Sequence, residues 1–248
     1  MTEQIKLEMI QEENLLTAEF FNQQWQIYQK VLKNNYMGHR EIYNVLHELL
    51  VKHWQKPFTL LDLGCGDGSF TTQALLNTQI AEYTGIDVSV PAIEDAKKNL
   101  AVTGCQGNFI IGDCWQLTNE LAQNEPNKFD VVFTSFALHH LQLEEKEDVI
   151  KNIKNLLKSG GIFILIDVVR QENEDRDSYV KRYLGNVKKD WTLITPQEYK
   201  MVDSHISSKD FPETQSNLKS ISEKVGFSNF ECVYRDDLDT TQLLCFYL

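Results

Sequence analysis

The sequence predicts an α/β protein built around a doubly wound, mostly parallel sheet. Two observations lead to this fold class. From Phe58 onward, short apolar runs alternate with amphipathic segments of helical length, and strands that alternate with helices in this way usually pair in parallel. The first apolar run also leads directly into glycines on alternate residues, Gly64, Gly66 and Gly68. A strand, a glycine turn and a helix together can present backbone N–H groups to a ligand at close range.

Residues 1–56 precede the first strong strand and are expected to form a helical extension, or cap. Residues 18–33 and 39–53 each carry large apolar side chains at helical spacing, which predicts two amphipathic helices. Residues 34–38 read as the loop between them, and Pro57 ends the extension.

The core, residues 57–248, is expected to begin with five strands joined by helices. The predicted strands are 59–63, 82–87, 107–111, 129–135 and 162–168. The predicted helices run over about 71–77, from Ser89 and Pro91 to about 102, 115–122 and 143–157. Ser69 or Thr71 is expected to cap the first of these helices, and residues 158–161, which include two glycines, are expected to form a C-terminal turn after the last one.

The regular alternation stops after Val169, which predicts a helical insert over about 170–212. Within it, residues 171–190 are charged but compatible with a helix, Thr195 and Pro196 begin another helix that runs to about His205, and a loop follows. A helix over 213–225 and two strands joined as a hairpin, 231–235 and 242–248, complete the chain. The sheet is therefore expected to have seven strands.

Composition limits the classes of function. Lys and Arg total 24 against 36 for Asp and Glu, giving a formal net charge of −12, and an acidic surface repels nucleic acid. The five cysteines are scattered and form no CxxC pair, which favours a reducing cytoplasm over a disulfide framework or zinc site. The mixed, charged residues 1–6 do not resemble a signal peptide. No apolar run approaches the roughly 20 residues that span a bilayer, so no membrane partner is expected.

The glycine turn alone leaves its ligand open. A dinucleotide-binding turn reads GxGxxG, whereas this chain reads GxGxG with Ser69 in the third glycine position. A glycine cluster by itself is a weak signal, so residues farther along the chain must decide between a dinucleotide and another cofactor.

Five segments in order resemble the motifs of the class I S-adenosylmethionine (SAM)-dependent methyltransferases. They are Leu61–Gly68, Gly85–Asp87, Gly112–Cys114, Phe129–Leu141 with its LHHL sequence, and Leu156–Gly161. The resemblance covers about residues 58–169 well and the final strand pair more loosely. It implies a Rossmann-like sheet whose last strand is antiparallel, with SAM as the cofactor.

The resemblance also implies which residues bind the cofactor, because they fall at the carboxyl ends of the strands, where ligands bind in such sheets. Asp87 would accept hydrogen bonds from the ribose hydroxyls, and Asp113 from the adenine amine. Gly64 and Gly66 would let the backbone approach the methionine part, and Arg40 would pair with its carboxylate. The other predicted cofactor residues are Asp62, Cys65, Val88, Cys114 and Ser135.

Simpler roles remain open for several of these residues. Asp62 can equally hold the turn by hydrogen bonds, and Asp87 and Asp113 can be turn acids at strand ends. Cys65 and Cys114 are expected to be small packing residues, since no neighbouring base in the sequence would activate them as nucleophiles.

The acceptor is expected to be a small molecule, methylated on oxygen, nitrogen or carbon. The segment after the fourth strand, Ser135–Leu138, lacks the Asn/Asp-Pro-Pro-Tyr pattern of many nucleic-acid and amide methyltransferases. His139 or His140 would lie near the methyl group and could act as a general base, or the pair could simply pack and cap a helix. Acceptor contacts are predicted from both flanking segments, at Tyr28, Tyr36, Tyr179, Arg182, Tyr183 and His205.

No metal site is predicted, because the spacing of His139, His140, Asp203 and His205 matches no recognised motif. The protein is expected to be a monomer or homodimer. Three other functions remain open: a non-catalytic SAM-binding protein, an aminopropyl-type transferase that uses the same fold, and a dinucleotide oxidoreductase.

Overall fold

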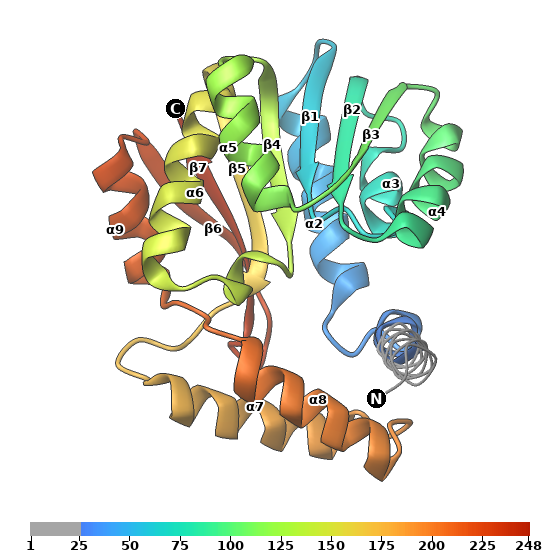
Figure 1. Ribbon diagram of the computed structural model, residues 1–248, viewed down its shortest axis with the longest axis vertical. Coiled ribbons are helices and arrows are strands. Elements are labelled where there is room, and N and C mark those ends of the chain that lie inside the picture. The colour runs from blue at the N-terminus through green and yellow to red at the C-terminus, as the bar shows by residue number, and fades with distance from the viewer. Residues whose placement is uncertain (1–25) are drawn as a thin grey trace, which may run out of the picture.

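Residues 26–248 of the computed structural model are described here, and they form one seven-stranded sheet (Figure 1). The strand order is β3-β2-β1-β4-β5-β7-β6. β1 to β5 are parallel, and β7 is antiparallel to both of its neighbours. This confirms the predicted fold class. The strands are β1 (Phe58–Leu63), β2 (Ile80–Asp87), β3 (Gln106–Ile111), β4 (Phe129–Ser135), β5 (Leu157–Val168), β6 (Asn229–Arg235) and β7 (Thr241–Tyr247).

The order of connection reverses between β1 and β4, which pair directly. Leu63, the last residue of β1, lies beside Ile86 of β2 on one side and Thr134 of β4 on the other. The Thr134 hydroxyl donates a hydrogen bond to the Leu63 carbonyl at 2.7 Å. At such a switch point the connections leave in opposite directions, and a crevice for ligands opens beyond the carboxyl ends of the strands.

Helices cover both faces of the sheet. One face packs against α2 (His39–His53), α3 (Ser69–Leu75) and α4 (Val90–Leu100), and the other against α5 (Cys114–Asn124), α6 (Leu143–Leu156) and α9 (Gln215–Val225). Two short 3₁₀ helices, η1 (Ala101–Thr103) and η2 (Leu138–His140), lie in the connections. Because both faces are covered, the central strands read as continuous apolar runs instead of alternating ones.

A third hydrophobic cluster lies beyond the carboxyl end of β5. It joins the helix at residues 26–33 to α7 (Arg176–Asp190) and α8 (Pro196–Lys209) through Ile27, Val31 and Ile206. Figure 1 shows α7 and α8 side by side across this end of the sheet. Both helices fall within the predicted insert. The earlier part of the predicted N-terminal helix, with Phe20, Phe21 and Trp25, lies outside the described residues.

Three local predictions need correction. The N-cap of α3 is Gly68, not Ser69 or Thr71, because the left-handed conformation of Gly68 turns the chain directly into the helix. Residues 158–161 belong to β5, not to a separate turn: the pairing with β4 jumps from Leu157 opposite Phe129 to Ile162 opposite Val131. α8 also continues to Lys209, past its expected end.

Two predicted helix starts are confirmed by their caps. The Ser89 hydroxyl accepts a hydrogen bond from the Ala92 amide at 3.3 Å, and Thr195 forms a reciprocal capping box with Glu198. Every helix within residues 26–248 is too short or too polar to cross a lipid bilayer.

Candidate functional site

The turn between β1 and α3 has the backbone conformation that the glycines predicted. Gly64, Gly66 and Gly68 have φ angles of +74°, +54° and +62°, in the left-handed region that other residues avoid. A Cβ on Gly64 would also lie only 3.3 Å from the Cβ of Ala137. The turn therefore sits against the segment that follows β4, at the switch point of the sheet.

Most amides of this turn are used internally, which corrects the expectation that they face a ligand. The amides of Gly64 and Cys65 donate to the Ile86 carbonyl at 2.9 and 3.0 Å. The Gly66 amide donates to Oδ2 of Asp87 at 2.8 Å, and the Gly68 amide to the Cys65 carbonyl at 3.0 Å. These bonds fix the turn to the end of β2 and hold its backbone in a single conformation.

Asp87 and Asp113 lie at the ends of neighbouring strands and have backbone partners. Asp87 also accepts from the Ser89 amide at 2.8 Å through Oδ1, and Asp113 caps α5 through bonds from two backbone amides at 2.9 Å. Each oxygen of Asp87 accepts one of these bonds and keeps a second lone pair for a ligand. In Asp113 both bonds end on Oδ1, so Oδ2 is the oxygen that a ligand would reach. Val88 and Ile111 are 66% and 51% exposed beside these acids. The carboxyl ends of β2 and β3 thus combine carboxylate oxygens that can accept hydrogen bonds with exposed apolar side chains.

Asp62 is buried beneath the turn. It accepts a hydrogen bond from the Tyr83 hydroxyl at 2.9 Å, and burial raises its pKa to about 7. Burial likewise raises the pKa of Cys65, and burial with the Asp113 carboxylate raises the pKa of Cys114 to about 12. Thiols held in the protonated form agree with the packing role predicted for both cysteines.

Ser135 and Arg40, the remaining predicted cofactor residues, have partners within the protein. The Ser135 hydroxyl lies 2.6 Å from the Tyr43 hydroxyl of α2. The Arg40 guanidinium is exposed and donates to the Lys33 carbonyl at 3.0 Å. Ser135 lies at the end of β4, whereas Arg40 begins α2.

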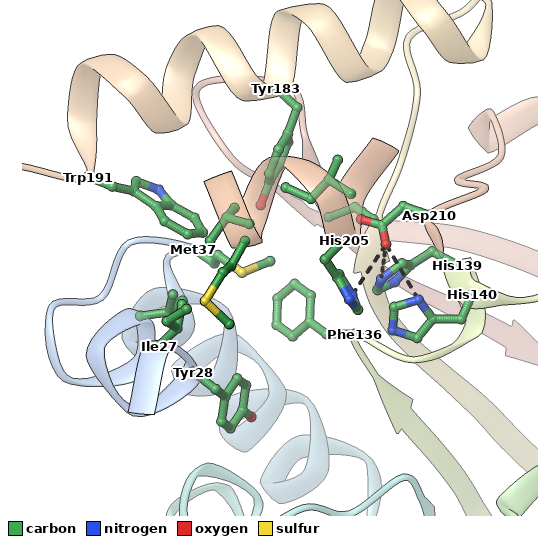
Figure 2. Close-up of a pocket in the computed structure, with 15 residues that line it drawn as sticks. Ile27, Tyr28, Met37, Phe136, His139, His140, Tyr183, Trp191, His205 and Asp210 are labelled. Atoms are coloured by element: carbon green, nitrogen blue, oxygen red, sulfur yellow. Dashed lines mark ion pairs between the residues drawn. The ribbon is translucent and has the colours of Figure 1, made fainter. Parts of the chain in front are cut away.

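A cavity of about 280 Å³ lies between the sheet and the insert helices. Its walls are mostly apolar and come from the helix at residues 26–33, α7, α8 and the ends of β4 and β5. Its three histidines and Asp210 gather at one end, as Figure 2 shows. The residues that line it are Ile27, Tyr28, Val31, Met37, Phe136, His139, His140, Val168, Tyr183, Trp191, Met201, Val202, His205, Ile206 and Asp210.

Tyr28 and Phe136 connect this cavity to the glycine turn. Burial, followed by the Asp67 and Asp87 carboxylates of the turn region, raises the pKa of Tyr28. Phe136 directly follows β4 and has a φ angle of +50°, an uncommon conformation for a bulky residue that tends to occur at functional sites. The cavity therefore begins next to the predicted cofactor site.

His139 is held rigidly at the polar end of the cavity. Its Nδ1 lies 2.5 Å from Oδ1 of Asp167, and its backbone amide donates to Oδ2 of the same carboxylate at 2.9 Å. Burial lowers the pKa of His139, but the Asp167 and Asp210 carboxylates outweigh this and leave the pKa above its ordinary value. With Nδ1 engaged, Nε2 is the atom left to face the cavity.

The predicted acceptor residues divide into two groups. Tyr28, Tyr183 and His205 line the cavity. The other three instead have structural partners: Tyr36 stacks on Trp191, Tyr179 stacks on Tyr183, and Arg182 pairs with Glu174 at 2.8 Å and donates to the carbonyls of residues 238 and 239. Tyr36 and Tyr179 therefore pack against the lining residues Trp191 and Tyr183 instead of lining the cavity themselves.

Sequence reasoning missed two acids of the site. Asp167 had a usable signal, because it is a lone carboxylate in the apolar run of β5 and such a residue needs a partner. Asp210 had none, since it lies in an irregular segment 70 residues beyond His140. The segment is held by the Phe211 amide, which donates to the His139 carbonyl at 2.7 Å, and by Arg176, which donates to the Asp210 carbonyl at 2.7 Å.

Comparison with known proteins agrees with this geometry. A family model described as a methyltransferase domain matches residues 55–229. An uncharacterized methyltransferase of Synechocystis is 34% identical over 128 residues, which are 52% of this chain and 54% of that protein. The juvenile hormone acid O-methyltransferase of Bombyx mori is 31% identical over 220 residues, which are 84% of this chain and 73% of that enzyme.

A solved structure shares the fold. The magnesium protoporphyrin IX methyltransferase of Synechocystis, crystallised with SAH bound, superposes with a TM-score of 0.56 at 19% identity, over 85% of this chain and 82% of that one. The family model matches more than half of the chain, and the Bombyx mori relative covers most of its length. The chain therefore belongs to the class I S-adenosylmethionine-dependent methyltransferases, enzymes whose methyl donor is S-adenosylmethionine.

Proposed function

We propose that this protein transfers the methyl group of SAM to a small molecule bound in the cavity beneath α7 and α8. One observation carries the proposal: the cavity extends from Tyr28, near the carboxylates of the glycine turn, to His139 directly after β4. A methyl donor seated at the turn and an acceptor in the cavity would then meet at the carboxyl ends of β1 and β4.

The lining of the cavity favours an acceptor with an apolar body and a polar head. Most of the walls are aliphatic or aromatic, while the histidines and Asp210 gather at one end. Such pockets bind by apolar contact and orient the ligand through a few polar groups. The Bombyx mori relative is named for O-methylation of an acid, and an acid with an apolar body is an acceptor of this kind.

The chain's contribution to the chemistry would be mainly positioning. The SAM methyl group is already electrophilic, so the protein needs to hold the acceptor atom roughly 3 Å away and in line, with water excluded. Asp167 fixes Nδ1 of His139, and this leaves Nε2 to accept a proton when the acceptor arrives protonated. His140 is more exposed and lacks a carboxylate at hydrogen-bonding distance, so His139 is the better placed of the two predicted bases.

Composition favours a small-molecule acceptor and a reducing compartment. The net charge of −12 disfavours a nucleic-acid substrate, and the five cysteines are free, as expected in the cytoplasm. A monomer or a homodimer agrees with this proposal, and light scattering on the purified protein would distinguish them.

The proposal is tested first with the cofactor. Calorimetric titration with SAM, SAH and NAD should show saturable binding of SAM and SAH. Incubation with methyl-labelled SAM and a fractionated metabolite extract should then label a small molecule. Binding of NAD without binding of SAM or SAH would overturn the proposal, and SAM binding without any methyl transfer would favour a non-catalytic SAM-binding protein.

A matched pair of variants on α8 tests whether the cavity binds the acceptor. Met201 lines the cavity, whereas its neighbour Lys200 is exposed outside it. We expect Met201→Trp to narrow the cavity and reduce labelling of the acceptor at least tenfold, with SAH affinity unchanged. Lys200→Trp should leave both unchanged. Equal activity in the two variants would place the acceptor elsewhere.

A further inference from the structure

The polar end of the cavity contains an unusual arrangement around one atom, Oδ1 of Asp210. Nε2 of His139, Nδ1 of His140 and Nε2 of His205 lie 3.7, 3.5 and 3.7 Å from it. Figure 2 shows the three imidazoles turned toward this carboxylate from two different parts of the chain. They come from the segment after β4 and from α8.

Within residues 26–248, Asp210 Oδ1 has no hydrogen-bond partner, although its side chain is only 9% exposed. A buried carboxylate oxygen without a partner costs free energy that folding normally avoids. Distances of 3.5 to 3.7 Å are too long for hydrogen bonds. The oxygen and the nearest imidazole nitrogens therefore lie close together without bonding directly to one another.

We propose that His139, His140 and Asp210 form a binding site for a divalent transition-metal ion. Ligand atoms of the three residues lie within 4.8 Å of one another. Around an ion with bonds of about 2.0–2.2 Å, tetrahedral ligand atoms lie roughly 3.3–3.6 Å apart, so only small side-chain movements are needed. Two imidazoles and one carboxylate suit Zn²⁺ and its first-row neighbours better than Mg²⁺ or Ca²⁺, which prefer oxygen ligands.

The surroundings of His139 match what metal-binding histidines require. Asp167 accepts from Nδ1 and thereby presents Nε2 as a lone-pair donor, the usual carboxylate–histidine–metal arrangement. His140 needs one adjustment: its Nδ1 lies 3.3 Å from the Lys209 carbonyl, and this atom must lose its proton to bind the ion. His205 packs edge-on against His140 with ring centroids 5.3 Å apart, close enough to border the site.

Three protein ligands leave a position that faces the cavity. An oxygen atom of the acceptor's polar head, such as a carboxylate, enol or hydroxyl, would complete the coordination, and this part of the inference rests on the proposed function. Coordination would lower the pKa of the acceptor oxygen, so the acceptor would release its proton to solvent as it binds the ion. His139 would then act as a ligand of the ion instead of accepting the acceptor's proton directly.

Calorimetric titration of the EDTA-treated protein with ZnCl₂, CoCl₂ and MgCl₂, together with absorption spectra of the Co²⁺ form, tests the site. We expect one equivalent of Zn²⁺ to bind, Co²⁺ to develop visible absorption bands of a nitrogen- and oxygen-ligated ion, and Mg²⁺ to bind at least tenfold more weakly. Absence of saturable Zn²⁺ binding, or Mg²⁺ binding of equal strength, would overturn the inference.

Variants identify the ligands. Asp210→Asn and His140→Gln should each weaken Zn²⁺ binding at least tenfold, whereas Asp203→Asn should not change it, because Asp203 on α8 accepts from the Ser207 hydroxyl outside the cluster. The His140 side chain is 38% exposed, so His140→Gln should fold even if Asp210→Asn does not. Equal affinities in all variants would exclude these residues as ligands.

Activity and metal binding can fail independently. Zn²⁺ binding that depends on Asp210, without methyl transfer to any small molecule, would support the metal site and contradict the proposed function. Undiminished methyl transfer in EDTA, with activity lost in His139→Asn, would support His139 as the direct base and contradict the metal site.

Discussion

Two buried acids, Asp62 and Asp210, differ in how the protein compensates for their burial. Asp62 accepts a hydrogen bond from the Tyr83 hydroxyl, and burial raises its pKa to about 7. In the described part of the chain, Oδ1 of Asp210 accepts no hydrogen bond, and the Nδ1 atom of His140 lies 3.5 Å from it. The first acid supports the glycine turn from below, whereas the second faces the cavity, where an ion or a ligand can reach it.

Replacement of Asp62 by asparagine should change how stability depends on pH. Between pH 3.8, the ordinary pKa, and about 7, the unfolded carboxyl ionises while the folded one keeps its proton. Asp62 therefore makes the native protein less stable as the pH rises through this range, by roughly 4 kcal/mol in total. The stability of Asp62→Asn relative to the wild type should rise from pH 4 to pH 7, as measured by urea unfolding.

The exposed Asp95 on α4 provides the control for this measurement. It pairs with Lys98 at the surface, so Asp95→Asn should follow the wild type across the same pH range. A constant difference between Asp62→Asn and the wild type would mean that Asp62 ionises normally in the folded protein.

Asp87 should determine cofactor affinity. Its carboxylate accepts hydrogen bonds from the amides of Gly66 and Ser89, and the resemblance to the methyltransferases predicts that it also binds the ribose hydroxyls of the cofactor. Hydrogen bonds to a charged group contribute about 1.5–3 kcal/mol, so Asp87→Asn should weaken SAH binding about 10- to 100-fold by calorimetry. An unchanged affinity would remove Asp87 from the cofactor site, and Asp95→Asn again serves as the control.

At the scale of elements, two glycines have opposite effects on helix stability, one at the start of α3 and one within α7. Gly68 begins α3 with a φ angle of +62°, and a Cβ there would lie 3.4 Å from the Cβ of Ala96. Gly185 lies within α7 with open space around it. The first glycine is required by backbone geometry, whereas the second only weakens its helix.

Alanine substitutions should separate these roles. Gly68→Ala should destabilise the protein by about 1–2 kcal/mol, the cost of a left-handed residue. Gly185→Ala should stabilise it by about 0.5–1 kcal/mol. Calorimetric melting should therefore show shifts of opposite sign, and two decreases of similar size would contradict this account of Gly185.

Lys146 joins α6 to the segment that carries Asp210. It is buried, with its ammonium group against the Phe211 carbonyl and 3.3 Å from Oε1 of Glu213. Lys146→Met would leave that carbonyl without its donor, while Glu213 keeps Arg170 and Asn217. We expect a loss of about 1–3 kcal/mol in unfolding free energy. Lys151→Met, at an exposed position of α6, should change the stability little.

At the scale of the whole molecule, the insert and the sheet belong to different hydrophobic clusters. The sheet is packed on both faces, whereas α7 and α8 share a smaller cluster with the helix at residues 26–33. Lys30 and Glu198 connect that helix to α8 through an ion pair at 2.6 Å, and a partly exposed pair of this kind adds only about 0–1 kcal/mol. The helices that cover the cavity are thus less strongly held than the sheet on which it lies.

Hydrogen exchange should reveal this difference. Amides of α7 and α8 should exchange through local opening with a lower free energy than amides of β4 and β5. Exchange followed by mass spectrometry would measure both regions in one experiment. Equal protection of the insert and the central strands would show that the cavity opens only when the whole protein unfolds.

The sequence by itself determined the fold and predicted where the cofactor site lies. Alternating apolar runs and amphipathic segments depend only on local spacing, so they predicted all seven strands. The need for a left-handed backbone at Gly64, Gly66 and Gly68 is also local, because the absence of a Cβ acts within the turn itself. Asp87 and Asp113 followed from their positions at strand ends.

Only the tertiary structure decided how the cavity is lined. Arg182 and Tyr179 lie on the same helix as Tyr183, yet they have structural partners while Tyr183 reaches the cavity. The approach of Asp210 to His139 and His140 depends on the path of the chain after α8, fixed by hydrogen bonds between residues far apart in sequence. Spacing along the chain carries no information about such contacts, because they form when separate elements pack together.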